Sequence, residues 1–194
     1  INNGGTLPMI TSCSPGWVNY AEYYYGDCLA HLSSCKSPHQ MEGAVIKSYY
    51  AEHNNIDPKD IFTVSIMPCT AKKYEKERPQ QITNGLKDVD CVLTTRELGR
   101  LIKRSGIDFR KLPDEEFDQD LMGIYTGAGA IFGVTGGVME AALRTAYYSL
   151  EGKEYGPVAF HEVRGFEGIK EAEFVIAGKE IKVAVAHGMK NAKP

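Results

Sequence analysis

The feature that most constrains the fold is a near-continuous run of β-branched and apolar side chains at residues 61–66. Such a run is typical of a strand buried on both faces, as in a parallel sheet covered by helices. A second short apolar strand is expected at 90–93, with helices before the first of these strands and a helix after the second, closed by Gly106. Strands that alternate with helices predict an α/β fold with a short, mostly parallel sheet.

Capping signals indicate where the helices begin. Ser14-Pro15 and Ser37-Pro38 each place an N-cap residue before a proline at the first helical position. The segment 94–97 has the form of a capping box. A short strand is expected at 7–10, just before the first of these helices.

The last third of the chain has a different pattern. A strong helix is expected at 138–150, followed by strands at 158–163, 173–176 and 180–185. Gly178 joins the last two strands tightly, which predicts an antiparallel hairpin near the C-terminus. We expect one lobe at about 1–125 and part of a second lobe at 126–194.

Charge and cysteine content exclude several classes of protein. The formal net charge is −3, which provides no basic field for nucleic acid or an anionic membrane, and no apolar run approaches membrane-spanning length. The cysteines lack the spacing of a zinc site, and a disulfide framework is not expected. We expect mostly reduced thiols at these five positions: Cys13, Cys28, Cys35, Cys69 and Cys91.

Three segments carry residues suited to chemistry. We name them the first motif (residues 11–17, TSCSPGW), the second motif (67–75, MPCTAKKYE) and the glycine motif (127–142, GAGAIFGVTGGVMEAA). The first two follow expected strands, and sites in open α/β sheets gather at the carboxyl ends of strands. A cysteine there is either a low-pKa thiol near a helix N-terminus or an inert buried residue. The glycine motif is a weak match to a nucleotide-binding loop, because Phe132 occupies the last glycine position.

Together, the three motifs resemble the H-cluster catalytic domain of [FeFe]-hydrogenases, also called iron-only hydrogenases. The family forms are TSCCPxW, MPCxxKKxE and GAGAIFGxTGGVMEAA, and the resemblance continues through 94–98 and 163–165. It implies reversible reduction of protons to dihydrogen at a four-iron cubane, which is bridged through a cysteine sulfur to a diiron unit with carbonyl and cyanide ligands. It also implies ferredoxin, NAD(P)-linked or other redox subunits as partners, and a cytoplasmic location.

The resemblance also implies roles for individual residues. Cys69 falls at a cubane-ligand position, and Cys13 falls at the thiol that passes protons to the diiron unit. Lys72 falls where a lysine donates to a cyanide ligand, which suits a compact ammonium with three donors. The remaining candidates are catalytic or line the cofactor pocket: Ser33, Glu75, Met67, Pro68, Phe132, Ser37 and Pro38. Plain structural interpretations also exist: Lys72 as an exposed surface lysine, the serines as helix caps, and Met67 and Phe132 as core residues.

Two departures from the family pattern bear on the cofactor. Ser14 stands where the family has a second cysteine that ligates the cubane, and a hydroxyl is a poor substitute for thiolate. Ser14 could instead cap the following helix. The family motif with the last two cluster cysteines lies further along than Pro194, so the chain looks cut from a longer protein. We therefore expect no H-cluster in this chain alone, and no activity.

Two related alternatives remain open. A hydrogenase-like sensory domain would bind a cluster but turn over slowly, and Ser14 favours it. A relative that works in iron–sulfur assembly would lack hydrogenase activity. Cys13, Lys72 and the glycine motif argue against the assembly relative, since the resemblance assigns all three to the diiron pocket. A binding module without redox chemistry is the least supported interpretation.

Overall fold

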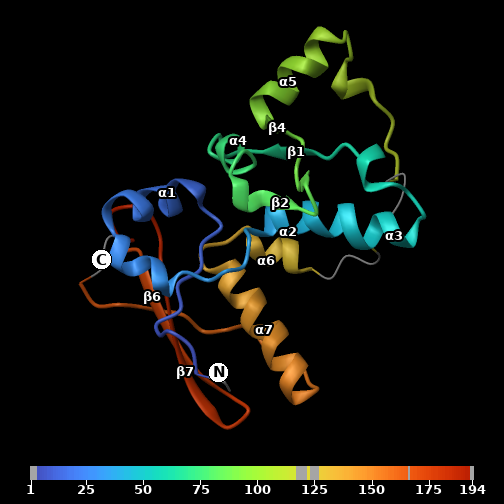
Figure 1. Ribbon diagram of the computed structural model, residues 1–194. Coiled ribbons are helices and arrows are strands. Elements are labelled where there is room, and N and C mark those ends of the chain that lie inside the picture. The colour runs from blue at the N-terminus through green and yellow to red at the C-terminus, as the bar shows by residue number, and fades with distance from the viewer. Residues whose placement is uncertain (1–3, 117–121, 123–126, 166, 193–194) are drawn as a thin grey trace. The chain divides into compact units, whose positions relative to one another are not determined.

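The computed structural model describes residues 4–116, 122, 127–165 and 167–192. The chain divides into two compact units, Ile1–Met122 and Gly123–Pro194. Figure 1 labels the helices and strands of both units and colours the chain by residue number. We call them the first and second unit and describe each by itself. Within the described ranges, no helix has both the length and the apolar character needed to cross a bilayer.

The first unit is mainly helical around a small parallel sheet. Its α-helices are α1 (Pro15–Tyr24), α2 (Pro38–Val45), α3 (Ala51–His53), α4 (Lys72–Glu75) and α5 (Thr95–Arg104). Short helical turns are η1 (Gly26–His31), η2 (Ile46–Tyr50), η3 (Pro58–Asp60), η4 (Pro79–Gln81) and η5 (Phe109–Lys111). The strands are β1 (Val64–Met67), β2 (Ile82–Thr83), β3 (Leu86–Lys87) and β4 (Cys91–Thr94).

Strands β1 and β4 pair in parallel, with Val64 opposite Cys91 and Met67 opposite Thr94. The intervening chain contributes α4 and the β2–β3 hairpin, and α5 follows β4 directly. Thr94 and Glu97 form the capping box at the start of α5, with both reciprocal hydrogen bonds present. The predicted α/β class with a small parallel sheet is therefore confirmed.

Two local expectations were wrong. Strand β1 is not buried on both faces, because Val64 and Ile66 are 51% and 42% exposed. Within the described residues, β1 and β4 form a sheet of only two strands, which is too narrow to bury the outer face of β1. The strand expected at 7–10 is reduced to a single bridge, in which Ile10 pairs in parallel with Leu32.

Helix α2 is held close to the loop before β4. Ser37 is its N-cap, and the Ser37 hydroxyl accepts a hydrogen bond from the backbone N–H of Gln40. Gly43 lies against the backbone of Asp88, where a Cβ would meet the carbonyl oxygen at 2.3 Å. Glycine is therefore required for this approach, which fixes how α2 lies against the rest of the first unit.

The second unit combines two helices with an antiparallel sheet. Helices α6 (Ala128–Phe132) and α7 (Gly137–Glu151) precede β5 (His161–Glu162), β6 (Ile169–Ile176) and β7 (Lys179–Ala186). The sheet order is β5-β6-β7, with both pairs antiparallel. Ala177 and Gly178 both have positive φ, as a two-residue hairpin turn requires. The predicted C-terminal hairpin is thus confirmed.

Candidate functional site

The first and second motifs meet at the side chain of Lys72. Its ammonium donates to the backbone carbonyl oxygen of Cys13 at 2.6 Å. It also lies 3.1 Å from both carboxylate oxygens of Glu75. The Lys72 and Glu75 side chains are only 9% and 7% exposed. The buried ion pair of the second motif is therefore hydrogen-bonded to the backbone of the first motif, although Cys13 and Lys72 are 59 residues apart.

The carboxylate of Glu75 is the centre of a cluster of polar side chains, which also includes Lys72, His39 and Gln40. Its Oε2 lies 3.1 Å from Nδ1 of His39 and 3.5 Å from the amide nitrogen of Gln40. Burial acts to raise the pKa of Glu75, but the hydrogen bond with His39 and the attraction of Lys72 outweigh it, with a further contribution from the hydroxyl of Ser37. The pKa of Glu75 is lowered as a result, and the carboxylate stays ionised beside the Lys72 ammonium.

His39 connects the cluster to the parallel sheet. Its Nε2 lies 2.7 Å from the hydroxyl oxygen of Ser65 in β1. A neutral imidazole satisfies both contacts when Nδ1–H donates to Glu75 and Nε2 accepts from Ser65. Helices α2 and α4 are therefore tied to β1 through one ring.

The thiols of the two motifs lie at the surface of the first unit. Cys13 and Cys69 are both free and exposed. Cys13 lies in the loop before α1, and Cys69 precedes α4, where its carbonyl accepts from the backbone N–H of Lys72 at 3.4 Å. Ser14 is the N-cap residue of α1, but its hydroxyl makes no capping hydrogen bond. Capping through the hydroxyl therefore does not explain why serine stands there.

The donor chemistry of these residues fits only part of a cubane site. A cubane is normally held by four thiolates, whereas the two motifs contain two thiols, Cys13 and Cys69, and the hydroxyl of Ser14 at a family ligand position. Among the residues that the structure describes, no three or more histidine, cysteine, aspartate or glutamate side chains form a metal-binding group. The buried Lys72 ammonium does provide a cation that suits an anionic ligand.

The other predicted site residues have simpler surroundings. The hydroxyl of Ser33 accepts from the backbone N–H of Cys35 at 3.2 Å, and Ser37 and Pro38 start α2. Met67 ends β1 and is half-buried, and Pro68 is exposed. Phe132 ends α6 in the second unit and is 39% exposed. The contacts thus join Cys13, Lys72, Glu75 and Ser37. The roles expected for these four residues and for the others stay predictions.

His39, Gln40 and Ser65 were missed by the sequence reasoning. Ser65 is a polar residue within an apolar strand, which was an available signal, since buried polar groups are held by partners. His39 and Gln40 lie in the first turn of α2, and Gln40 was expected there only as a capping-box residue. Only the structure shows that His39 and Gln40 both contact Glu75, and that Ser65 contacts His39.

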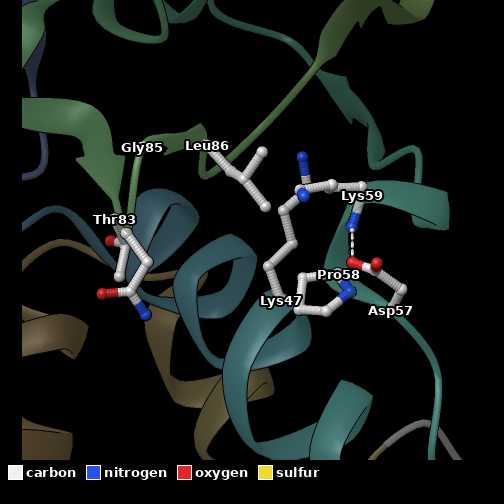
Figure 2. A pocket seen from close by; sticks show the side chains of 8 residues that line it. Lys47, Asp57, Pro58, Lys59, Thr83, Gly85 and Leu86 are labelled. Carbon is white, nitrogen blue, oxygen red and sulfur yellow. Dashed lines mark hydrogen bonds between the residues drawn. The ribbon is translucent and has the colours of Figure 1, made fainter.

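A pocket of the first unit lies apart from these residues. It is lined by Lys47, Asp57, Pro58, Lys59, Thr83, Asn84, Gly85 and Leu86. Figure 2 shows the backbone N–H of Lys59 donating to the carboxylate of Asp57, at 3.0 Å. The ammonium of Lys47 is already bound by Asp90 and by the carbonyl of Lys87. None of the predicted site residues lines this pocket.

Known proteins similar to this chain include hydrogenases and assembly factors. The periplasmic [Fe] hydrogenase large subunit of Nitratidesulfovibrio vulgaris is 56% identical over 187 residues, covering 96% of this chain and 44% of that protein. The cytosolic iron-sulfur assembly component 3 of Pongo abelii is 34% identical, covering 95% of this chain and 40% of that protein. The chain thus spans less than half the length of either relative.

Solved structures agree with this similarity. An apo [FeFe]-hydrogenase HydA1 variant from Chlamydomonas reinhardtii matches with a TM-score of 0.77 and 41% identity, covering 95% of this chain and 53% of that chain. The family model described as iron only hydrogenase large subunit, C-terminal domain, matches residues 1–194. With its three motifs and its small parallel sheet, the chain belongs to the iron-only hydrogenase large subunit family, as part of the C-terminal domain.

Proposed function

We propose that this chain forms part of the catalytic domain of an iron-only hydrogenase, which reversibly reduces protons to dihydrogen. The observation that carries the proposal is the buried ammonium of Lys72, which joins the first motif to the second at 2.6 Å from Cys13. The 56% identity to a hydrogenase large subunit supports it further. The 34% identity to an assembly component gives weaker support to the alternative without hydrogenase activity.

Each candidate residue has a proposed task. Cys69 would hold the cubane of the H-cluster, which supplies the redox chemistry when it is bound. The exposed thiol of Cys13 can take up and release a proton, and the Lys72 ammonium can donate to an anionic ligand, with Glu75 as its counter-ion. Ser33 is proposed to belong to the proton path. The remaining candidates would line the cofactor pocket: Met67, Pro68, Phe132, Ser37 and Pro38.

The activity is proposed for the longer protein rather than for these 194 residues. The chain contains Cys69 as its one family ligand to the cubane, and a single thiolate cannot organise a cluster that needs four. We therefore propose that the chain alone binds no complete H-cluster and is inactive. In the full-length protein, ferredoxin, an NAD(P)-linked subunit or another redox subunit would exchange electrons with the site, and the compartment would be the cytoplasm.

One observation favours the sensory alternative. Ser14 occupies a family ligand position, and its hydroxyl makes no capping hydrogen bond. Replacing a thiolate by a harder oxygen donor weakens a cubane site. A hydrogenase-like domain that senses rather than turns over rapidly would tolerate this change.

Replacement of Lys72 by methionine tests the proposal. In the matured full-length protein, Lys72→Met should lower hydrogen evolution by about 10–100-fold, because residues that orient a metal site have effects of this size. Lys73→Met is the matched control, since the Lys73 side chain is 40% exposed and pairs with Glu97 instead. Hydrogen evolution and iron content should be measured for both variants. Equal activity of Lys72→Met and the parent protein would show that Lys72 has no role in the site.

A further inference from the structure

We propose that His39 is a positioning residue, which holds the ammonium of Lys72 at the first motif by fixing the orientation of the Glu75 carboxylate. The proposal rests on the proposed function only in assigning Lys72 to the cofactor site. His39 is absent from the motifs that identify the family. Its place in the cluster follows from contacts in this structure.

The imidazole of His39 is held from two sides. Its side chain is 4% exposed, with one ring nitrogen 3.1 Å from Glu75 in α4 and the other 2.7 Å from Ser65 in β1. A ring bonded at both nitrogens cannot rotate without breaking a buried hydrogen bond. The position of the Glu75 carboxylate is therefore set by β1 through His39.

The orientation of Glu75 in turn determines where the Lys72 ammonium lies. Three oxygen atoms surround this ammonium: the carbonyl oxygen of Cys13 at 2.6 Å and the two carboxylate oxygens of Glu75 at 3.1 Å each. Leaving a buried ammonium without its counter-ion is strongly unfavourable. If the carboxylate turned away, the ammonium would follow it or move toward solvent, and its bond to Cys13 would be lost.

Lys47 provides a reference within the same unit. Its side chain is 7% exposed, close to the value for Lys72. Its ammonium binds the carboxylate of Asp90 at 2.6 Å and the carbonyl of Lys87 at 2.7 Å. Among the contacts of the described residues, no histidine joins this second pair. A change at His39 should therefore leave Lys47 unaffected unless the whole unit loosens.

Reductive methylation of lysines measures this directly. The full-length protein would be purified without cluster maturation, treated with formaldehyde and cyanoborohydride, and the methylation rates of Lys72 and Lys47 followed by peptide mass spectrometry. His39→Leu should raise the rate at Lys72 by about tenfold, the effect of losing one buried hydrogen bond, with Lys47 unchanged. His39→Gln should stay within about twofold of the parent protein, because its amide can still donate to Glu75.

Three results would overturn the proposal: unchanged protection of Lys72 in His39→Leu, equal acceleration at Lys72 and Lys47, or His39→Gln behaving like His39→Leu. The last result would mean that His39 acts through packing alone. Because the assay needs neither cluster nor turnover, its outcome is independent of whether the full-length protein evolves hydrogen. Failure of the proposed function would therefore appear in the Lys72→Met activity measurement and not here.

Discussion

Replacing Gly43 by alanine tests how tightly α2 must lie against the loop before β4. An alanine Cβ at this position would lie 2.3 Å from the carbonyl oxygen of Asp88 and 2.9 Å from a methyl carbon of Val89. The first of these atoms is backbone, so a side-chain rotation cannot relieve the clash. Helix α2 would have to move away by about 1 Å to restore ordinary contact, which interiors packed at native density resist.

The expected loss of stability follows from two opposing effects. Forcing a methyl group into a closely packed site costs about 1–3 kcal/mol. Alanine is favoured over glycine inside a helix by about 1 kcal/mol. We therefore expect Gly43→Ala to lower the free energy of unfolding of the first unit by up to about 2 kcal/mol. Since α2 also carries His39, the same movement should disturb the hydrogen bond between His39 and Glu75.

Gly99 in α5 provides the control, because a Cβ there meets no heavy atom within 4 Å. Gly99→Ala should raise stability by about 0.5–1 kcal/mol, since only the helix preference changes. Urea unfolding followed by the fluorescence of Trp17, the one tryptophan of the chain, reports on the first unit. The midpoint should fall for Gly43→Ala and rise for Gly99→Ala. A higher midpoint for both variants would refute the packing of α2 against Asp88.

Two further predictions concern the cysteines outside the motifs and the response to acid. Replacing Cys28, Cys35 or Cys91 by alanine should leave the iron content of the full-length protein intact. Loss of iron from any one of these variants would contradict the prediction. The pKa values of Glu75 and Asp90 are lowered from 4.5 and 3.8, in each case by hydrogen bonds and a lysine that outweigh burial. Both carboxylates therefore stabilise the fold above these values, and this contribution is lost as pH falls through the lowered pKa values. The urea midpoint should be steady near neutral pH and fall below about pH 4.5; a midpoint that rises on acidification would contradict the ion pairs.

The sequence was most informative where the signal is local. The capping box of Thr94 and Glu97 and the helix starts at Pro15 and Pro38 were predicted, because each depends on residues within one turn. The parallel pairing of β1 and β4 agrees with the parallel sheet that was predicted from strands alternating with helices along the chain.

The remaining features depend on contacts between distant segments. The exposure of Val64 and Ile66 reflects how few strands the sheet has, which the composition of one strand does not reveal. His39 and Ser65 are 26 residues apart and carry no motif, so their hydrogen bond became visible only in three dimensions. The site itself was predicted through the family resemblance. Free cysteines and single lysines are ambiguous by residue type alone.

The iron and acid-labile sulfide content of the matured full-length protein, with and without Cys69→Ala, tests the central proposal most directly. Cys91→Ala is the matched control, because Cys91 lies in β4, where it pairs opposite Val64. We expect the parent protein and Cys91→Ala to retain their iron and sulfide, and Cys69→Ala to lose most of both, since a cubane missing a thiolate ligand is poorly held. An unchanged iron and sulfide content in Cys69→Ala would contradict the assignment of Cys69 as a cluster ligand, and with it the proposed hydrogenase site.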